Sequence, residues 1–207
     1  MVKTQFQIPA PADFNFRRTV YSHGWYDLPP FELDKDNWIL TRTFDFENAP
    51  PVSASIREIG SGLEIEVYAE VNKTQAAKIE RDFRRVLQLD EDFSDFYRLT
   101  KGEKDFSWIS DTGAGRLLRS PTVWEDLVKT ICTTNCSWAL TKKMVVNLVE
   151  KLGETTQDGR KSFPAPSAMA AHDTDFYKNE IRAGYRSAYF AELAEKAAGG
   201  KLDVESW

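Results

Sequence analysis

Two stretches of the chain, residues 52–56 and 63–70, alternate apolar and polar side chains with the period of a β-strand. Residues 63–70 place Leu, Ile, Val and Ala at every second position, with Glu or Tyr between them. Residues 52–56 repeat the pattern, and the Ile-Gly-Ser-Gly segment at 59–62 is typical of a hairpin turn. Residues 38–46 predict a further strand. The front of the chain is therefore expected to form an antiparallel sheet of about four or five strands, whose polar side chains face water.

Helical spacing replaces this alternation from about Thr74 onward. The first apolar stripe consists of Ile79, Phe83, Val86 and Leu87. Further helical regions are expected at 93–97, 144–152 and 189–197, and a short helix after Pro166. Gly153 is placed to end the helix at 144–152, and Gly199–Gly200 to end the last one.

The segment 116–138 combines a helix with an abrupt polar interruption. Ser120 before Pro121 predicts the helix start, because proline at the first helical position loses no hydrogen bond. The apolar stripe that follows is Trp124, Leu127, Val128 and Ile131. Small polar residues at 133–137 then interrupt it, and such residues favour caps and turns over helix interiors. We expect a rigid elbow between two helices that holds Asn135 at a fixed point.

Strands first and helices afterwards predict the α+β fold class. We expect residues 1–105 to form a domain with an antiparallel sheet and helices. Residues 106–207 are expected to form a second, helical domain.

Composition narrows the class of protein. The chain has 207 residues, of which 42% are hydrophobic and 13% aromatic, as in a folded protein. It holds no apolar run of about 18 residues, and its first residues lack a signal core, so we expect a cytoplasmic protein with no membrane association. We further expect it to be monomeric. Cys132 and Cys136 are the two cysteines, and we interpret them as reduced packing thiols rather than as a disulfide or part of a metal site.

The net charge of −5 argues against a nucleic-acid partner when taken alone. Residues 106–207 contain 13 acidic and 13 basic side chains, which leaves 19 acidic and 14 basic in residues 1–105. The rear half is thus neutral and can carry a local basic rim. That rim would consist of Arg116, Arg119, Lys129, Lys142 and Lys143.

Three blocks in the rear half, at 115–144, 163–170 and 182–189, resemble the helix-hairpin-helix (HhH-GPD) DNA glycosylases. The 3-methyladenine and 8-oxoguanine DNA glycosylases are the most similar members. The resemblance implies a glycosylase-like N-terminal domain followed by the first helices of an all-α glycosylase lobe. It further implies base excision repair, by hydrolysis of the N-glycosidic bond of a damaged purine, alkylated or oxidised, flipped out of duplex DNA. The implied partner is double-stranded DNA containing a damaged base, and no cofactor or metal is implied.

The same resemblance assigns roles to three residues. Asn135 matches an asparagine that enters the space vacated by the flipped base, where its amide can both donate and accept hydrogen bonds. Tyr185 matches an aromatic wedge between base pairs, and Arg186 an arginine that contacts the orphan base. Structural roles remain open for each: a turn residue for Asn135, a packing aromatic for Tyr185 and a solvated surface charge for Arg186.

Two departures from the family pattern affect lesion choice. Leu140 stands where the 8-oxoguanine enzymes have a second arginine that reads the orphan cytosine. His23 lies near the position of a lesion-sensing glycine but is interpreted as a turn or packing residue. These departures favour alkylated bases or a broad lesion range.

The catalytic residues implied by the family are expected beyond Trp207, as is the phosphate-binding hairpin. Glu125 and Asp126 are interpreted as first-turn charges that favour the helix dipole, not as catalysts. We therefore expect the 207 residues alone to lack excision activity. Two alternatives stay open: a truncated, non-catalytic protein that binds distorted DNA or a protein partner, and a truncated reading frame without a stable product. A salt series in a gel shift distinguishes DNA binding from the others, because phosphate contacts weaken steeply with salt.

Overall fold

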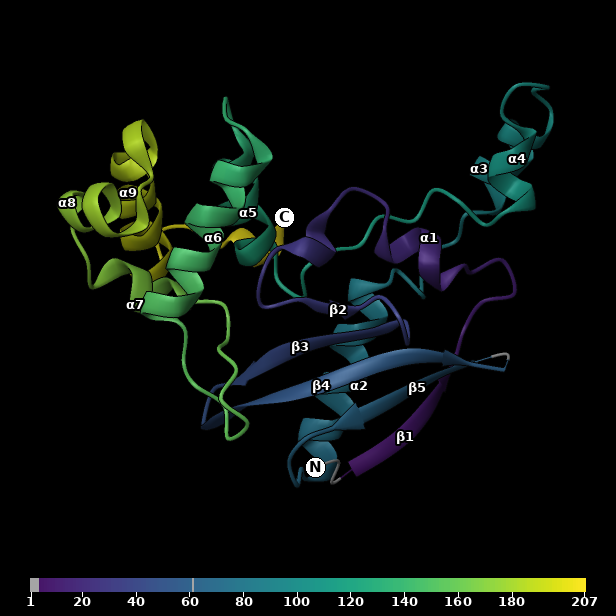
Figure 1. Ribbon diagram of the computed structural model, residues 1–207, viewed down its shortest axis with the longest axis horizontal. Helices are drawn as coiled ribbons and strands as arrows, with labels where there is room; N and C mark the ends of the chain where they lie inside the picture. Colours follow the sequence, from purple (N-terminus) through teal and green to yellow (C-terminus); the bar gives the residue numbers. More distant parts are fainter. Residues whose placement is uncertain (1–3, 61) are drawn as a thin grey trace. The chain divides into compact units, whose positions relative to one another are not determined.

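The computed structural model describes residues 4–60 and 62–207, and it has the expected α+β architecture (Figure 1). Its helices and strands group into two compact units, each assembled from several stretches of the chain. The first unit contains the described residues of 1–27, 31–41 and 54–121, and the second contains 28–30, 42–53 and 122–207.

These units differ from the division at residue 105 that the sequence predicts. Residues 106–121 belong to the first unit, because backbone hydrogen bonds tie them there: Arg119 N–H donates to Val86 O at 3.0 Å, and Leu118 N–H to Ser22 Oγ at 2.9 Å. The hairpin segment 42–53 belongs to the second unit.

The strands form the antiparallel sheet that the alternation predicts. The strand order is β1-β5-β4-β3-β2, and Ile59 pairs with Gly62 at the expected β4–β5 hairpin, of which Ser61 lies outside the described residues. The strands are β1 (Thr4–Pro9), β2 (Glu32–Asp34), β3 (Ile39–Phe46), β4 (Ala49–Ile59) and β5 (Gly62–Val67).

The polar face of β5 is less exposed than its sequence predicts. Glu64 is buried, because Arg57 stands opposite it on β4 and its Nε donates to the Glu64 carboxylate at 2.8 Å. The alternation of the sequence identified the polar face of β5. It did not predict that an ion pair with the neighbouring strand buries Glu64 on that face.

The first unit also contains the predicted amphipathic helix. Helix α2 (Lys73–Val86) buries Ile79, Phe83 and Val86, and a capping box of Asn72 and Gln75 fixes its start. The other helices of this unit are α1 (Phe16–Val20), η1 (Trp25–Asp27), α3 (Ser94–Lys101) and α4 (Ser107–Asp111).

Helices make up most of the second unit. Helix α5 packs against α6, and α7 against α9. Gly153 is the C-cap of α6, as predicted, and the position takes a glycine because a Cβ there would lie 2.2 Å from the Ser162 carbonyl oxygen. The helices are α5 (Val123–Thr133), α6 (Trp138–Leu152), α7 (Pro166–Ala170), α8 (Thr174–Phe176), the π-helix η2 (Tyr177–Ile181), η3 (Gly184–Arg186), α9 (Ser187–Ala198) and η4 (Val204–Ser206).

The predicted start of α5 at Ser120 is wrong by two residues. Thr122 is the N-cap, and its side chain accepts from Glu125 N–H at 3.2 Å. The carboxylate of Glu205 accepts from Val123 N–H at 3.0 Å and from Trp124 N–H at 2.9 Å. A residue more than eighty positions away thus satisfies amides that every helix leaves without an internal partner.

Within the described ranges, no helix has both the length and the apolar character needed to span a bilayer.

Candidate functional site

The polar elbow predicted around Asn135 separates α5 from α6. Helix α5 ends at Thr133, and Ser137 caps α6, so residues 134–137 form the connection. Asn135 has a φ of 45°, in the left-handed region that asparagine tolerates better than most residues. Its side chain is exposed. The elbow therefore holds an amide at a fixed, solvent-facing point, as expected.

Tyr185 reaches the same point from a second loop. It lies in η3, after Gly184 with a φ of 61°, and its side chain is 56% exposed. The Tyr185 hydroxyl lies 3.1 Å from Thr134 Oγ1 and accepts from Asn135 Nδ2 at 3.4 Å. The hydrogen bond with Thr134 is the main cause that lowers the pKa of the Tyr185 hydroxyl, and the hydrogen bond with Asn135 lowers that pKa further. Two residues fifty positions apart thus stand side by side on the surface.

Arg186 holds the elbow by hydrogen bonds from its buried side chain. It is only 3% exposed, so the alternative of a solvated surface charge is wrong. Its Nε donates to the Ile131 carbonyl and to Thr134 Oγ1, both at 3.1 Å, and its Nη2 donates to the Thr134 carbonyl. These are carbonyls at the C-terminal end of α5, where a cation is favoured. The guanidinium also lies 4.5 Å from the Tyr185 ring centre.

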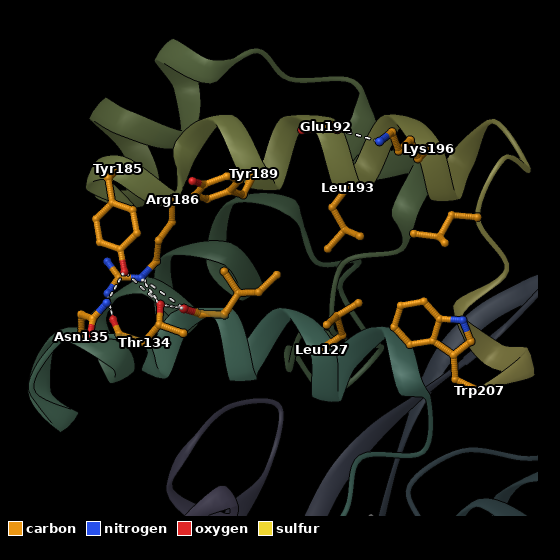
Figure 2. Close-up of a pocket in the computed structure, with 12 residues that line it drawn as sticks. Leu127, Thr134, Asn135, Tyr185, Arg186, Tyr189, Glu192, Leu193, Lys196 and Trp207 are labelled. Atoms are coloured by element: carbon orange, nitrogen blue, oxygen red, sulfur yellow. Dashed lines mark hydrogen bonds and ion pairs between the residues drawn. The ribbon is translucent and has the colours of Figure 1, made fainter.

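The three residues line one end of a groove with a volume of about 570 Å³. Tyr189 is 57% exposed beside Tyr185, their ring centres 6.5 Å apart, and further along Glu192 and Lys196 pair at 2.6 Å. Figure 2 shows the hydrogen-bonded side chains at one end and apolar ones at the other. The first are Thr134, Asn135, Tyr185 and Arg186, and the second are Leu127, Leu193 and Trp207.

A buried ion cluster, which the sequence did not reveal, holds α5 in place. Glu125 lies in the first turn of α5, as predicted, but it is 2% exposed and pairs with Arg42 at 3.0 Å and with Lys129 at 2.6 Å. Burial alone would raise the pKa of Glu125, but Arg42 and Lys129 outweigh it and lower that pKa. Burial lowers the pKa of Lys129, against the pull of Glu125. The i,i+4 spacing of Glu125 and Lys129 was the only sequence signal.

The predicted basic rim is correspondingly smaller. Arg116 and Lys129 are both buried, at 2% and 0% exposed, and each is paired with a carboxylate. Of the other three, Lys143 is exposed, whereas Arg119 and Lys142 are partly exposed.

Other predicted features occupy ordinary positions. His23 stacks on Trp25 with ring centres 4.6 Å apart, consistent with a packing residue. Leu140 is exposed in the first turn of α6. Cys132 and Cys136 are free thiols, and burial raises the pKa of Cys132 to about 12, so it stays protonated.

Metal coordination finds no support in the described part of the chain, which holds no cluster of three or more His, Cys, Asp or Glu side chains suited to an ion.

Comparison with known proteins shows similarity to DNA glycosylases. An N-glycosylase/DNA lyase from Saccharomyces cerevisiae is 30% identical over 106 residues, which cover 49% of this chain and 28% of that protein. MBOgg1, solved in complex with a low-affinity DNA ligand, superposes with a TM-score of 0.74 at 22% identity, over 97% of this chain and 65% of that one. The 3-methyladenine DNA glycosylase from Archaeoglobus fulgidus superposes with a TM-score of 0.74 at 16% identity, over 99% of this chain and 69% of that one.

A third solved structure contains duplex DNA. It is the 8-oxoguanine glycosylase/lyase from Clostridium acetobutylicum, with cytosine opposite 8-oxoG, and it gives a TM-score of 0.71 at 15% identity over 99% of this chain and 68% of that one. No family model matches the chain. The chain therefore resembles DNA glycosylases in sequence and shares their fold, and it spans about two thirds of the length of these solved structures.

Proposed function

We propose that this chain forms the DNA-engaging part of a base-excision DNA glycosylase. The complete enzyme would hydrolyse the N-glycosidic bond of a damaged purine flipped out of duplex DNA. The observation that carries the proposal is the convergence of two exposed side chains, Asn135 and Tyr185, on a rigid elbow at the end of a groove. Similarity to the yeast N-glycosylase/DNA lyase supports it.

Each exposed side chain has a physical task once a base leaves the stack. Extrusion leaves a gap and an unpaired partner base, which costs a few kcal/mol. The Tyr185 ring can fill the gap by stacking, and the Asn135 amide can donate to and accept from the orphan base. The buried Arg186 is a positioning residue in this scheme, because its donors are already committed to the elbow.

The proposed lesion class rests on Leu140 in the first turn of α6. Leu140 offers no hydrogen bond at the position where 8-oxoguanine enzymes have an arginine. We therefore propose an alkylated base, or a broad range of damaged purines. The partner would be double-stranded DNA that contains a damaged base. The protein would bind it as a monomer in the cytoplasm, and at the nucleoid if the cell is bacterial.

Tyr185 and Asn135 variants test the proposal on a duplex carrying an abasic-site analogue. We expect Tyr185→Ala to weaken binding about tenfold or more, whereas Tyr185→Phe keeps the ring and most of the affinity. Asn135→Gly should also weaken it several-fold, and glycine avoids the strain that alanine would meet at a φ of 45°. Fluorescence anisotropy measures the affinities.

Asn179→Ala provides the matched control, because Asn179 is an exposed asparagine of the same unit outside the groove. Equal affinity of Tyr185→Ala and the unaltered chain, with melting temperatures unchanged, would rule out the wedge.

The 207 residues alone are expected to release no base. The family resemblance matches no carboxylate of the chain to the catalytic one, and Glu125 is buried in an ion cluster. Incubation with alkylated and oxidised duplexes, followed by chromatography of free bases, measures this. Release above the no-protein background would show that the chain contains its own catalytic group.

A further inference from the structure

A second cavity, of about 430 Å³, lies in the first unit and is far more basic than the groove. We call it the α1–α4 pocket. Three arginines and no carboxylate occur among the nine described residues that line it. These are Arg17, Arg18, Tyr21, Ser22, Trp108 and residues 114–117.

Two of its arginines carry uncompensated charge. Arg17 and Arg18 are exposed on α1, and within the described ranges neither makes an ion pair with a carboxylate. Their guanidinium groups instead lie over aromatic rings, Arg17 at 4.5 Å from Trp38 and Arg18 at 5.7 Å from Trp108. An anion entering the pocket would therefore meet two available donors with planar geometry.

Arg116, the third arginine, does not add to this charge. Its guanidinium is buried and bonded to the Asp13 carboxylate, to the Tyr97 hydroxyl and to the backbone oxygens of Gln88 and Glu91. It anchors the wall of the pocket.

The same pocket exposes flat apolar surface. Trp108 is 50% exposed and Tyr21 is 41% exposed, and both line the cavity. Exposed tryptophan beside uncompensated arginine is the combination that holds an unpaired nucleotide: the ring stacks on the base, and the guanidinium binds the phosphate. A carboxylate-rich peptide would use the arginines but would not need the rings.

The pocket is formed in advance of any ligand. Its wall at 114–117 is fixed by Leu118 N–H donating to Ser22 Oγ at 2.9 Å, and Asn15 Nδ2 donates to the Thr112 carbonyl at 3.1 Å. Gly115 has a φ of 119°, and a Cβ there would lie 2.7 Å from the Phe96 ring. A preformed site loses less entropy on binding.

We propose that the α1–α4 pocket binds one unpaired nucleotide of a single-stranded nucleic acid, with the base stacked on Trp108 and the phosphate held by Arg17 and Arg18. A paired base in a duplex cannot expose its face to the ring. This inference goes beyond the proposed glycosylase function, because it requires neither a lesion nor a duplex. The lining shows no group dedicated to a 2′-hydroxyl, so DNA and RNA strands should bind alike.

Anisotropy with fluorescent dT12, U12 and an undamaged, fully paired two-strand duplex tests the pocket in the 207-residue chain. Trp108→Leu should weaken dT12 and U12 binding about tenfold or more. The double variant Arg17→Ala/Arg18→Ala should reduce the slope of log affinity against log salt by about 0.7, the value for one lost single-strand phosphate contact. Neither variant should change duplex binding.

Matched controls come from the same unit. Phe106→Leu removes an exposed aromatic outside the pocket, and Arg81→Ala/Arg98→Ala removes two exposed arginines outside it. Both should retain wild-type binding to dT12.

Three results would overturn the pocket assignment: no binding of dT12 or U12, losses in the controls equal to those in the pocket variants, or displacement of dT12 by polyglutamate at equal charge. Failure of the Tyr185 wedge would leave these measurements unaffected, because they use no lesion. The two proposals can therefore fail separately.

Discussion

Replacing Glu125 with alanine is expected to lower the free energy of unfolding by about 3–5 kcal/mol, the cost of removing one partner from a buried ion pair. The carboxylate is 2% exposed and lies between Arg42 at 3.0 Å and Lys129 at 2.6 Å. Without it, the two buried cations would lose the carboxylate that both of them contact. Urea denaturation followed by circular dichroism measures the change.

The control replaces the whole cluster. A variant with Arg42→Met, Glu125→Leu and Lys129→Met removes the charges together, and well-packed apolar replacements of buried ion clusters are often neutral or stabilising. If the triple variant recovers most of the stability that Glu125→Ala loses, the loss is due to the buried charges that lack the Glu125 carboxylate. If Glu125→Ala instead unfolds at the same urea concentration as the unaltered chain, the cluster contributes nothing.

The same cluster predicts a direction for the acid dependence. The folded-state pKa of Glu125 is lowered by its two cations, so its contribution is fully present above the unfolded-state pKa. That contribution is lost as the pH falls through the folded-state pKa. The unaltered chain should therefore lose stability relative to the triple variant as the pH falls.

Replacing Arg186 with methionine is the second large effect that we expect. It would remove several hydrogen bonds to the end of α5 and lower the free energy of unfolding by about 3 kcal/mol, the scale of one or two bonds to a charged group. Affinity for the abasic duplex should fall with it, because the elbow would lose its anchor. Urea melts and anisotropy on the same samples measure both.

Arg182→Met is the matched control, since Arg182 is an exposed arginine in the same loop.

An alternative outcome separates the two roles of Arg186. Loss of DNA affinity with unchanged stability would mean that the guanidinium contacts DNA directly, and that the elbow stands without it.

Local patterns in the sequence predicted the local features of the structure. The strand alternation at 52–56 and 63–67 and the C-cap of α6 at Gly153 are both read from residues close to one another in the sequence. The elbow at Asn135 is local in the same sense, because small polar residues favour turns wherever the chain goes.

Features that depend on distant partners could not be predicted. Glu125 and Arg42 are 83 positions apart, and no spacing rule relates a strand residue to a helix residue at that distance. Arg186 is buried for a similar reason, because it satisfies the Ile131 carbonyl 55 positions earlier. A charged side chain is usually exposed, and Glu125 and Arg186 are buried because each of them binds a group that is distant in the sequence.

Because Glu205 contacts the start of α5, two amide protons of that helix are expected to reveal whether residues 204–206 are docked. Val123 and Trp124 donate to that carboxylate and not to a helical carbonyl. Their hydrogen–deuterium exchange rates therefore follow the docking of residues 204–206, independently of how the rest of the helix opens. Slow exchange at these two amides alone would show that residues 204–206 contact the start of α5, and rapid exchange would show that they do not.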